Sequence, residues 1–101
     1  MKRKHRRRNL PVRLTDEEYK TLLIRQGGGC AICGRPPKKI RLSVDHDHRT
    51  GKTRGLLCMR CNRGLVWFSD DAQCLSRASE YIRRALVYPD AVILMRRGEL
   101  I

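Results

Sequence analysis

The first apolar pattern along the chain predicts a helix close to the N-terminal end. Thr15 stands at an expected cap position, and Glu18 follows three residues later, which is the spacing of a capping box. Apolar residues then recur at helical spacing until Gly27-Gly28-Gly29 ends the pattern. We therefore predict a helix over about residues 16–26. Its apolar face consists of Tyr19, Leu22 and Leu23.

The middle of the chain has a period of two, which is typical of strands. Apolar and polar residues alternate over residues 40–44, and the segment from Asp45 to His48 closes this strand. Turn-forming residues occupy positions 49–52, and residues 53–57 form a returning strand. We expect a β-hairpin here, followed by a short helix that begins near Cys58 and extends to about Phe68.

A second helical pattern covers about residues 70–88, with Ser69 or Asp70 as the expected cap. Its apolar face consists of Leu75, Ala78, Tyr81, Ile82, Ala85 and Leu86. The apolar run at residues 91–95 fits either a strand or a helical turn, and it can pack on the core or on a second copy of the protein. Residues 1–9 are basic without an apolar anchor, so we expect a flexible arm that either binds phosphate or is simply solvated.

Composition adds size, charge and compartment to this pattern. A chain of 101 residues has room for one domain, which we place at residues 10–101. Its 23 basic and 10 acidic residues give a formal net charge of +13, which favours a polyanionic partner. Nucleic acid is the first candidate, and an anionic membrane surface is the second. No apolar run approaches the ~20 residues that span a bilayer, and the basic N-terminus lacks the apolar part of a signal peptide, so we expect a soluble cytoplasmic protein.

Four of the five cysteines fall in two CxxC pairs, Cys30 with Cys33 and Cys58 with Cys61. Two such pairs can close a tetrahedral four-sulfur site, which is the geometry that zinc prefers and which leaves no open coordination position. We therefore expect a structural Zn²⁺ that helps to hold a core poor in aromatic residues. Disulfides and redox chemistry are the weaker alternatives. Cys74 stands alone and is expected to be a small buried residue on a helix.

A cluster of metal-ligand and acid–base residue types follows the first predicted strand: Asp45, His46, Asp47 and His48. In a regular strand Asp45 and His46 point to opposite sides, so both can serve one site only if the strand ends or bulges between them. Hydrolysis of a phosphodiester needs a water, a base and a cation. Asp45 and Asn62 can bind a hard divalent cation through oxygen, and a neutral His46 can be the base. The alternatives are a polar hairpin tip or additional zinc ligands.

The sequence GGGCAICGRPP at residues 27–37, followed by VDHDHRTGKTRGLLCMRCNRGL at residues 44–65, resembles the recombination endonuclease VII family. This family is a phage-type branch of the HNH (ββα-metal, His-Me finger) nucleases. The resemblance implies a zinc-stapled hairpin plus helix with one catalytic Mg²⁺ or Mn²⁺. It implies that Asp45 and Asn62 bind this cation, that His46 is the general base, and that His48 orients or assists at the phosphate. It also implies DNA cleavage that leaves 5′-phosphate and 3′-hydroxyl ends.

The sequence thus predicts a small α+β protein, a zinc-stapled ββα-metal (HNH-like) domain with flanking helices and a motif core at residues 27–68. The predicted function is metal-dependent DNA endonuclease activity in a bacterial or phage-infected host cell, by nicking, double-strand cleavage or cleavage of branched DNA. The sequence leaves open whether the protein forms a homodimer. The alternative is a non-catalytic zinc-ribbon protein that binds nucleic acid. The arginines expected to grip DNA phosphates are Arg49, Arg54, Arg60 and Arg63.

Overall fold

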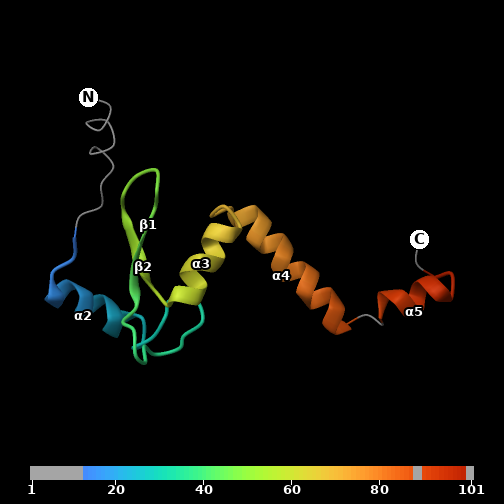
Figure 1. Cartoon of the computed structure of the whole chain (residues 1–101), viewed down its shortest axis with the longest axis horizontal. Helices are drawn as coiled ribbons and strands as arrows, with labels where there is room; N and C mark the ends of the chain where they lie inside the picture. The colour runs from blue at the N-terminus through green and yellow to red at the C-terminus, as the bar shows by residue number, and fades with distance from the viewer. Residues whose placement is uncertain (1–12, 88–89, 100–101) are drawn as a thin grey trace. The chain divides into compact units, whose positions relative to one another are not determined.

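The computed structural model describes residues 13–87 and 90–99 (Figure 1). The chain forms two compact units, Met1–Val66 and Trp67–Ile101, and each is described by itself. The elements of the first unit are helix α2 (Asp16–Arg25), strands β1 (Ser43–His46) and β2 (Thr53–Leu57), and nearly all of helix α3 (Met59–Trp67). Those of the second unit are α4 (Ala72–Val87) and α5 (Ala91–Arg96). The predicted arm at residues 1–9 lies outside the described residues, and a single domain over residues 10–101 stays a prediction.

Helix α2 begins at the predicted residue, and its cap has the predicted form. Oγ1 of Thr15 accepts a hydrogen bond from the backbone N–H of Glu18 at 3.1 Å, and the Glu18 carboxylate accepts one from the N–H of Thr15 at 2.8 Å. This reciprocal pair is a capping box. Gly27 and Gly28 follow with φ of 77° and 83°, which glycine adopts at little cost. The chain can therefore leave the helix and turn toward the first cysteine pair.

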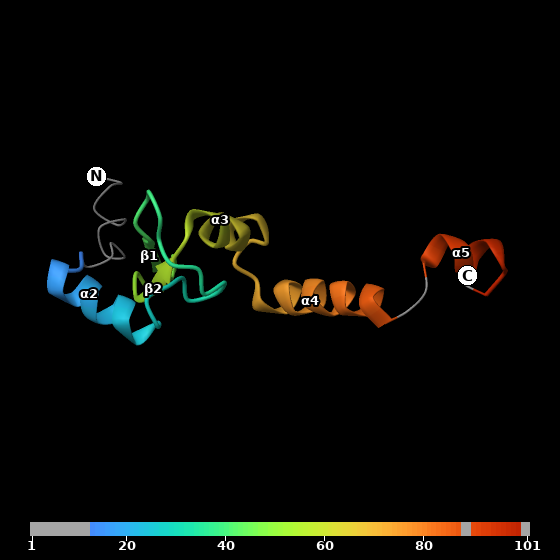
Figure 2. The same cartoon turned by 90° about the horizontal axis from the view of Figure 1, so that it is seen from below.

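The hairpin is confirmed, but its first strand begins three residues later than the alternation predicts. Pairing of β1 with β2 is antiparallel and starts with Ser43 opposite Leu57. Just before it, the carbonyl of Leu42 accepts a hydrogen bond from the hydroxyl of Tyr19 at 2.9 Å. The segment that precedes β1 is therefore bonded to α2, which stands beside the hairpin in both views (Figure 1 and Figure 2). Ile40, predicted to lie in the strand, is 64% exposed.

The two strands change register between Asp45 and His46. Asp45 lies opposite Gly55, whereas His46 lies opposite Thr53, so β2 contributes one extra residue, Arg54, at this step of the ladder. Such a β-bulge bends the strand and re-aims the side chains beside it. A strand end or a bulge is needed for Asp45 and His46 to serve one site; β1 ends at His46 and the extra residue lies in the partner strand β2, so a shared site for the two side chains stays a prediction.

A small core lies between α2, the hairpin and the cysteine pairs. Leu56 is fully buried, and Cys30, Leu42 and Leu57 are at most 3% exposed. Partly buried apolar residues pack around them: Leu14, Tyr19, Leu22, Leu23, Val44 and Leu65. So few buried side chains indicate that the four clustered cysteines help to hold this unit. The helices, the two-stranded sheet and this cluster confirm the predicted α+β class.

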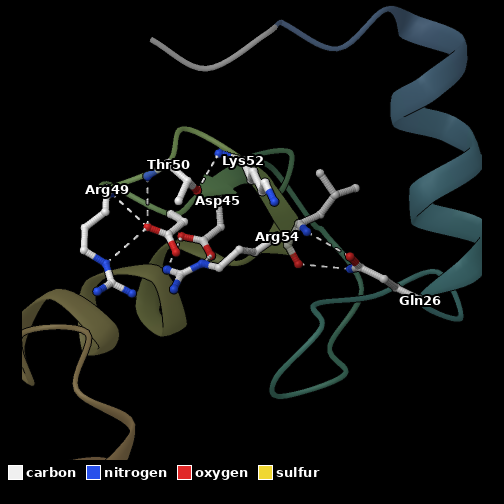
Figure 3. A network of polar contacts seen from close by, with 8 residues as sticks. Gln26, Asp45, Arg49, Thr50, Lys52 and Arg54 are labelled. Atoms are coloured by element: carbon white, nitrogen blue, oxygen red, sulfur yellow. Dashed lines mark hydrogen bonds and ion pairs between the residues drawn. The ribbon is translucent and has the colours of Figure 1, made fainter. Parts of the chain in front are cut away.

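Gln26, just after α2, joins this helix to β2 (Figure 3). Its Nε2 donates hydrogen bonds to the carbonyl of Gly29 at 2.9 Å and to that of Leu56 at 3.0 Å. Its Oε1 accepts a hydrogen bond from the N–H of Leu56 at 2.8 Å. The side-chain amide thus bonds to β2 much as a neighbouring strand would. This contact fixes the segment before the first cysteine pair against the strand that leads to the second pair.

In the second unit, the cap of α4 differs from the prediction. Oδ1 of Asp71 accepts hydrogen bonds from the backbone N–H groups of Gln73 at 2.9 Å and Cys74 at 3.2 Å, so Asp71 is the cap. The predicted caps Ser69 and Asp70 both have φ of 55°. That left-handed conformation forms the turn before the helix and does not suit a capping residue.

The apolar face of α4 is exposed within its unit. The exposed fractions of Tyr81, Ile82 and Leu86 are 71%, 61% and 82%, and Cys74 is also exposed, which corrects its predicted burial. The reason is that, within the second unit, no other described helix packs on α4. The run at residues 91–95 is helical, and Asp90 caps α5. Among the residues that the structure describes, no helix is long and apolar enough to cross a membrane.

Candidate functional site

Four cysteine sulfurs gather at one point of the first unit. The Sγ atoms of Cys30, Cys33, Cys58 and Cys61 all lie within 4.8 Å of one another. Those of Cys33 and Cys58 are 3.8 Å apart. A regular tetrahedron with Zn–S bonds of about 2.3 Å has edges of about 3.8 Å. The four sulfurs therefore form a site that can hold a metal ion such as zinc, as the CxxC spacing predicts.

The local backbone explains why each cysteine pair turns back on itself. The N–H of Ile32 donates to Sγ of Cys30, and the N–H of Cys61 donates to Sγ of Cys58, both at 3.4 Å. Just before the first pair, a Cβ placed on Gly29 would lie 2.2 Å from the carbonyl oxygen of Gly34. The turn therefore needs glycine at position 29, because any side chain would collide with backbone.

The ionisation of the thiols also suits a cation at their centre. Burial opposes the charged form of Cys30, but hydrogen bonds from the backbone N–H groups of Cys33, Cys58 and Ile32 outweigh burial and lower the pKa of this thiol to about 6. At Cys61, burial and the neighbouring sulfurs raise the pKa to about 12. A metal binds the thiolate form, so it supplies the positive charge that this crowded group of sulfurs requires.

Asp45 is a buried carboxylate on β1, with an exposed fraction of 7%. Arg54 holds both of its oxygens: Nε lies 2.7 Å from Oδ2, and Nη2 lies 3.2 Å from Oδ1 (Figure 3). Two parallel charge-assisted hydrogen bonds of this kind fix a carboxylate in position and direction. The structure thus joins two residues that the sequence placed in different roles, Asp45 at the cation and Arg54 at the DNA.

His46 lines a groove of about 560 Å³ between α2 and β1. The wall opposite β1 includes Tyr19, and the guanidinium of Arg41 lies 3.9 Å from the centre of the Tyr19 ring. Arg13 also lines this groove. His46 is half-buried at this groove.

The tip of the hairpin is organised by Asp47. Its Oδ1 accepts hydrogen bonds from the N–H groups of Arg49 at 2.8 Å and Thr50 at 3.3 Å. The bond from the Arg49 N–H is the main reason that the pKa of the Asp47 carboxyl is lowered, and the guanidinium charges of Arg49 and Arg54 act in the same direction. The contacts of Asp47 are therefore those of a polar hairpin tip, one of the alternatives that the sequence left open. His48 is exposed beside it.

Asn62 lies in the first turn of α3, directly after the second cysteine pair. Its N–H donates to the carbonyl of Cys58 at 2.9 Å, and the residue is half-buried. Arg60 and Arg63 are exposed on the same helix. Each predicted site residue therefore lies on the hairpin or on α3, which the cysteine cluster connects.

Three contacts near this site were not predicted from the sequence. They are the amide bridge of Gln26, the pairing of Arg54 with Asp45, and the stacking of Arg41 on Tyr19. The Gln26 bridge and the stacking of Arg41 on Tyr19 join residues that are 30 and 22 positions apart, so no local sequence pattern predicts them. The third depends on the register change in the hairpin, which an alternation pattern does not reveal.

The chain is similar in sequence to one protein family and to two phage proteins. A sequence profile described as recombination endonuclease VII matches residues 4–84 of the chain. The Gene 59 protein of Mycobacterium phage D29 is 49% identical over 73 residues, and the Gene 59 protein of Mycobacterium phage L5 is 51% identical over 71 residues. These matches cover 70% and 68% of this chain but only 44% and 43% of the two relatives, so the chain spans less than half of their length. No solved structure matches the chain.

Proposed function

The chain belongs to the recombination endonuclease VII family, and from this premise we propose that it is an HNH-type DNA endonuclease that uses one divalent cation and a histidine base. The observation that carries the proposal is the bulge between Asp45 and His46. It lies in a hairpin whose second strand leads through Cys58 of the cysteine cluster into α3, the helix that carries Asn62. The cluster would therefore act as a staple that keeps hairpin and helix in a fixed arrangement.

In the proposed reaction, the oxygens of Asp45 and Asn62 would hold one Mg²⁺ or Mn²⁺, which would supply positive charge at the scissile phosphate. His46 takes a proton from the water that attacks phosphorus. The bond from phosphorus to the 3′ oxygen breaks, this oxygen takes up a proton from solvent water, and the products carry a 5′-phosphate and a 3′-hydroxyl. The open groove beside His46 supports its role because it gives water and substrate access to the imidazole. His48 assists at the phosphate.

The charge of the chain supports DNA as the substrate. The formal net charge is +13, and the side chain of Arg49 is 91% exposed at the hairpin tip. Arg60 and Arg63 are exposed on α3. Such side chains contact phosphates without reading sequence, so binding should weaken steeply as salt is raised. Arg54 is the exception, because its guanidinium is held by Asp45.

A plasmid assay tests the proposed activity. Zinc-loaded protein is incubated with supercoiled plasmid, with and without Mg²⁺ or Mn²⁺, beside the variants His46→Ala and Gln73→Ala. We expect relaxed or linear plasmid only with a divalent cation, at least a hundredfold slower cleavage for His46→Ala, and unchanged cleavage for Gln73→Ala, which alters an exposed residue of α4. Equal cleavage by His46→Ala and wild type would refute the role of the imidazole.

The second candidate function is a non-catalytic zinc-ribbon module that binds nucleic acid. The observation that favours it is the ion pair of Asp45 with Arg54, which occupies the carboxylate that a catalytic cation needs. The same assay separates the two functions. Wild-type protein that binds the plasmid but leaves it intact with either cation would establish the binding module.

The partner state is a separate proposal. The exposed apolar face of α4 supports a homodimer in which two copies of this helix cover each other. Sedimentation of the wild type and of Leu86→Asp, whose residue is 82% exposed, tests this assembly. We expect a dimer for the wild type and a monomer for the variant, and a wild-type monomer at every concentration would contradict the proposal.

A further inference from the structure

The ion pair of Asp45 and Arg54 is built into the centre of the proposed nuclease site. Arg54 reaches the two carboxylate oxygens with two different nitrogens, at 2.7 and 3.2 Å. The side chain of Asp45 is 9% exposed and that of Arg54 is 35% exposed. The carboxylate is therefore enclosed by protein, while part of the guanidinium remains accessible from outside.

The bulge explains why these two side chains meet. In a regular ladder, the residue after the one opposite Asp45 would point to the other face of the sheet. Here β2 contributes Arg54 as an extra residue between the partners of Asp45 and His46. Two residues of a bulged strand oppose one residue of the partner strand, so Arg54 can face Asp45 beside Gly55, and its guanidinium bonds to the carboxylate. The register change beside Asp45 is thus the feature that places Arg54 there.

A divalent cation and the guanidinium compete for the same atoms. Both need the oxygens of Asp45, and their positive charges repel at the short distance that sharing one carboxylate imposes. Building on the function proposed above, we propose that Arg54 is a resident counter-cation of Asp45, and that the catalytic Mg²⁺ or Mn²⁺ takes the place of its guanidinium.

The surroundings of Arg54 indicate where the released guanidinium goes. Asp47 is the neighbouring carboxylate: its Oδ1 accepts two backbone N–H groups, and the guanidinium charges of Arg49 and Arg54 both stabilise its charged form. A DNA phosphate brought to the site offers oxygens that can accept the N–H donors displaced from Asp45. The cation therefore binds first, and Arg54 becomes a phosphate ligand only afterwards. Arg54 positions Asp45 in the cation-free protein and contacts substrate in the loaded one.

Binding of Mn²⁺ without DNA tests the exchange separately from cleavage. The free Mn²⁺ signal is measured by electron paramagnetic resonance during titration of zinc-loaded wild type, Arg54→Gln, Asp45→Asn and Arg49→Gln. We expect Arg54→Gln to bind Mn²⁺ at least fivefold more tightly than wild type, because the competing cation is gone. Arg49→Gln removes the same charge from the same hairpin, but at a side chain that is 91% exposed, so its affinity should change less than twofold.

The outcomes separate this inference from the proposed function. If Asp45→Asn binds Mn²⁺ as the wild type does, Asp45 is not a cation ligand, and both the metal assignment and the exchange are wrong. If Asp45→Asn loses binding while Arg54→Gln binds no more tightly than wild type, the exchange alone is wrong.

A measurement on the unaltered protein covers the case in which Arg54→Gln does not fold. The Nε–H resonance of Arg54 is followed by ¹⁵N NMR while diamagnetic Mg²⁺ is added. We expect a saturable shift away from its hydrogen-bonded position, absent in Asp45→Asn. A resonance that stays in place while backbone signals of β1 shift to saturation would overturn the exchange.

Discussion

The amide of Gln26 should contribute strongly to the stability of the first unit. Replacement by Glu keeps the size of the side chain but puts an oxygen in place of Nε2, so the donor to the carbonyls of Gly29 and Leu56 is lost. Two hydrogen bonds at roughly 1 kcal/mol each disappear, and an acceptor now faces the carbonyl oxygens of two buried residues, which adds about 1 kcal/mol or more. The free energy of unfolding should therefore fall by about 3 kcal/mol, which is roughly a hundredfold change in the folding equilibrium.

Thermal unfolding followed by circular dichroism measures this loss. All samples carry the same excess of zinc, because a ligand that binds the folded state adds to its apparent stability. We expect Gln26→Glu to lower the midpoint by more than about 10 °C. The matched control is Gln73→Glu, the same chemical change at an exposed position in the first turn of α4, where a negative charge is favourable. If both variants unfold within about 1 kcal/mol of wild type, Gln26 does not join α2 to β2 as described.

Three further predictions follow from individual contacts. Gly29→Ala should prevent stable zinc uptake, because its Cβ would lie 2.2 Å from a backbone oxygen. The control Gly64→Ala lies in open space on α3 and should raise the free energy of unfolding by about 0.5–1 kcal/mol. Zinc content and thermal unfolding check both variants, and normal zinc uptake by Gly29→Ala would contradict the collision. Zinc uptake should release more protons per ion at pH 5.5 than at pH 7.5. The pKa of Cys30 is lowered to about 6, so its thiol is protonated only at the lower pH, while Cys61, with a pKa raised to about 12, gives up its proton at both. Equal proton release at the two pH values in an indicator-dye titration would contradict this prediction. Asp71→Ala should reduce the helix content of α4 by removing its cap, at a cost of about 1 kcal/mol, and circular dichroism with unchanged helix content would argue against this cap.

Several features of the site follow from short stretches of sequence. The CxxC spacing is enough to predict the four-sulfur cluster, because two nearby cysteines on a tight turn present both thiols to one ion. The hairpin was predicted from turn residues between two apolar segments, and β2 has the expected bounds. The roles of His46, His48 and Asn62 came from residue type and family resemblance, and they stay predictions.

Sequence by itself determined what depends on neighbours along the chain. The capping box of α2 joins Thr15 to a residue three positions away, so the local sequence is sufficient to predict this cap. Only the tertiary structure decided where β1 begins, because that depends on a hydroxyl of α2 that bonds to Leu42 across 23 positions. It also decided that Asp45 faces Arg54, because one extra residue in a ladder redirects side chains without changing the apolar pattern. The physical reason is the same in both cases: a contact between distant segments is chosen by packing and register, and these exist only after the chain has folded.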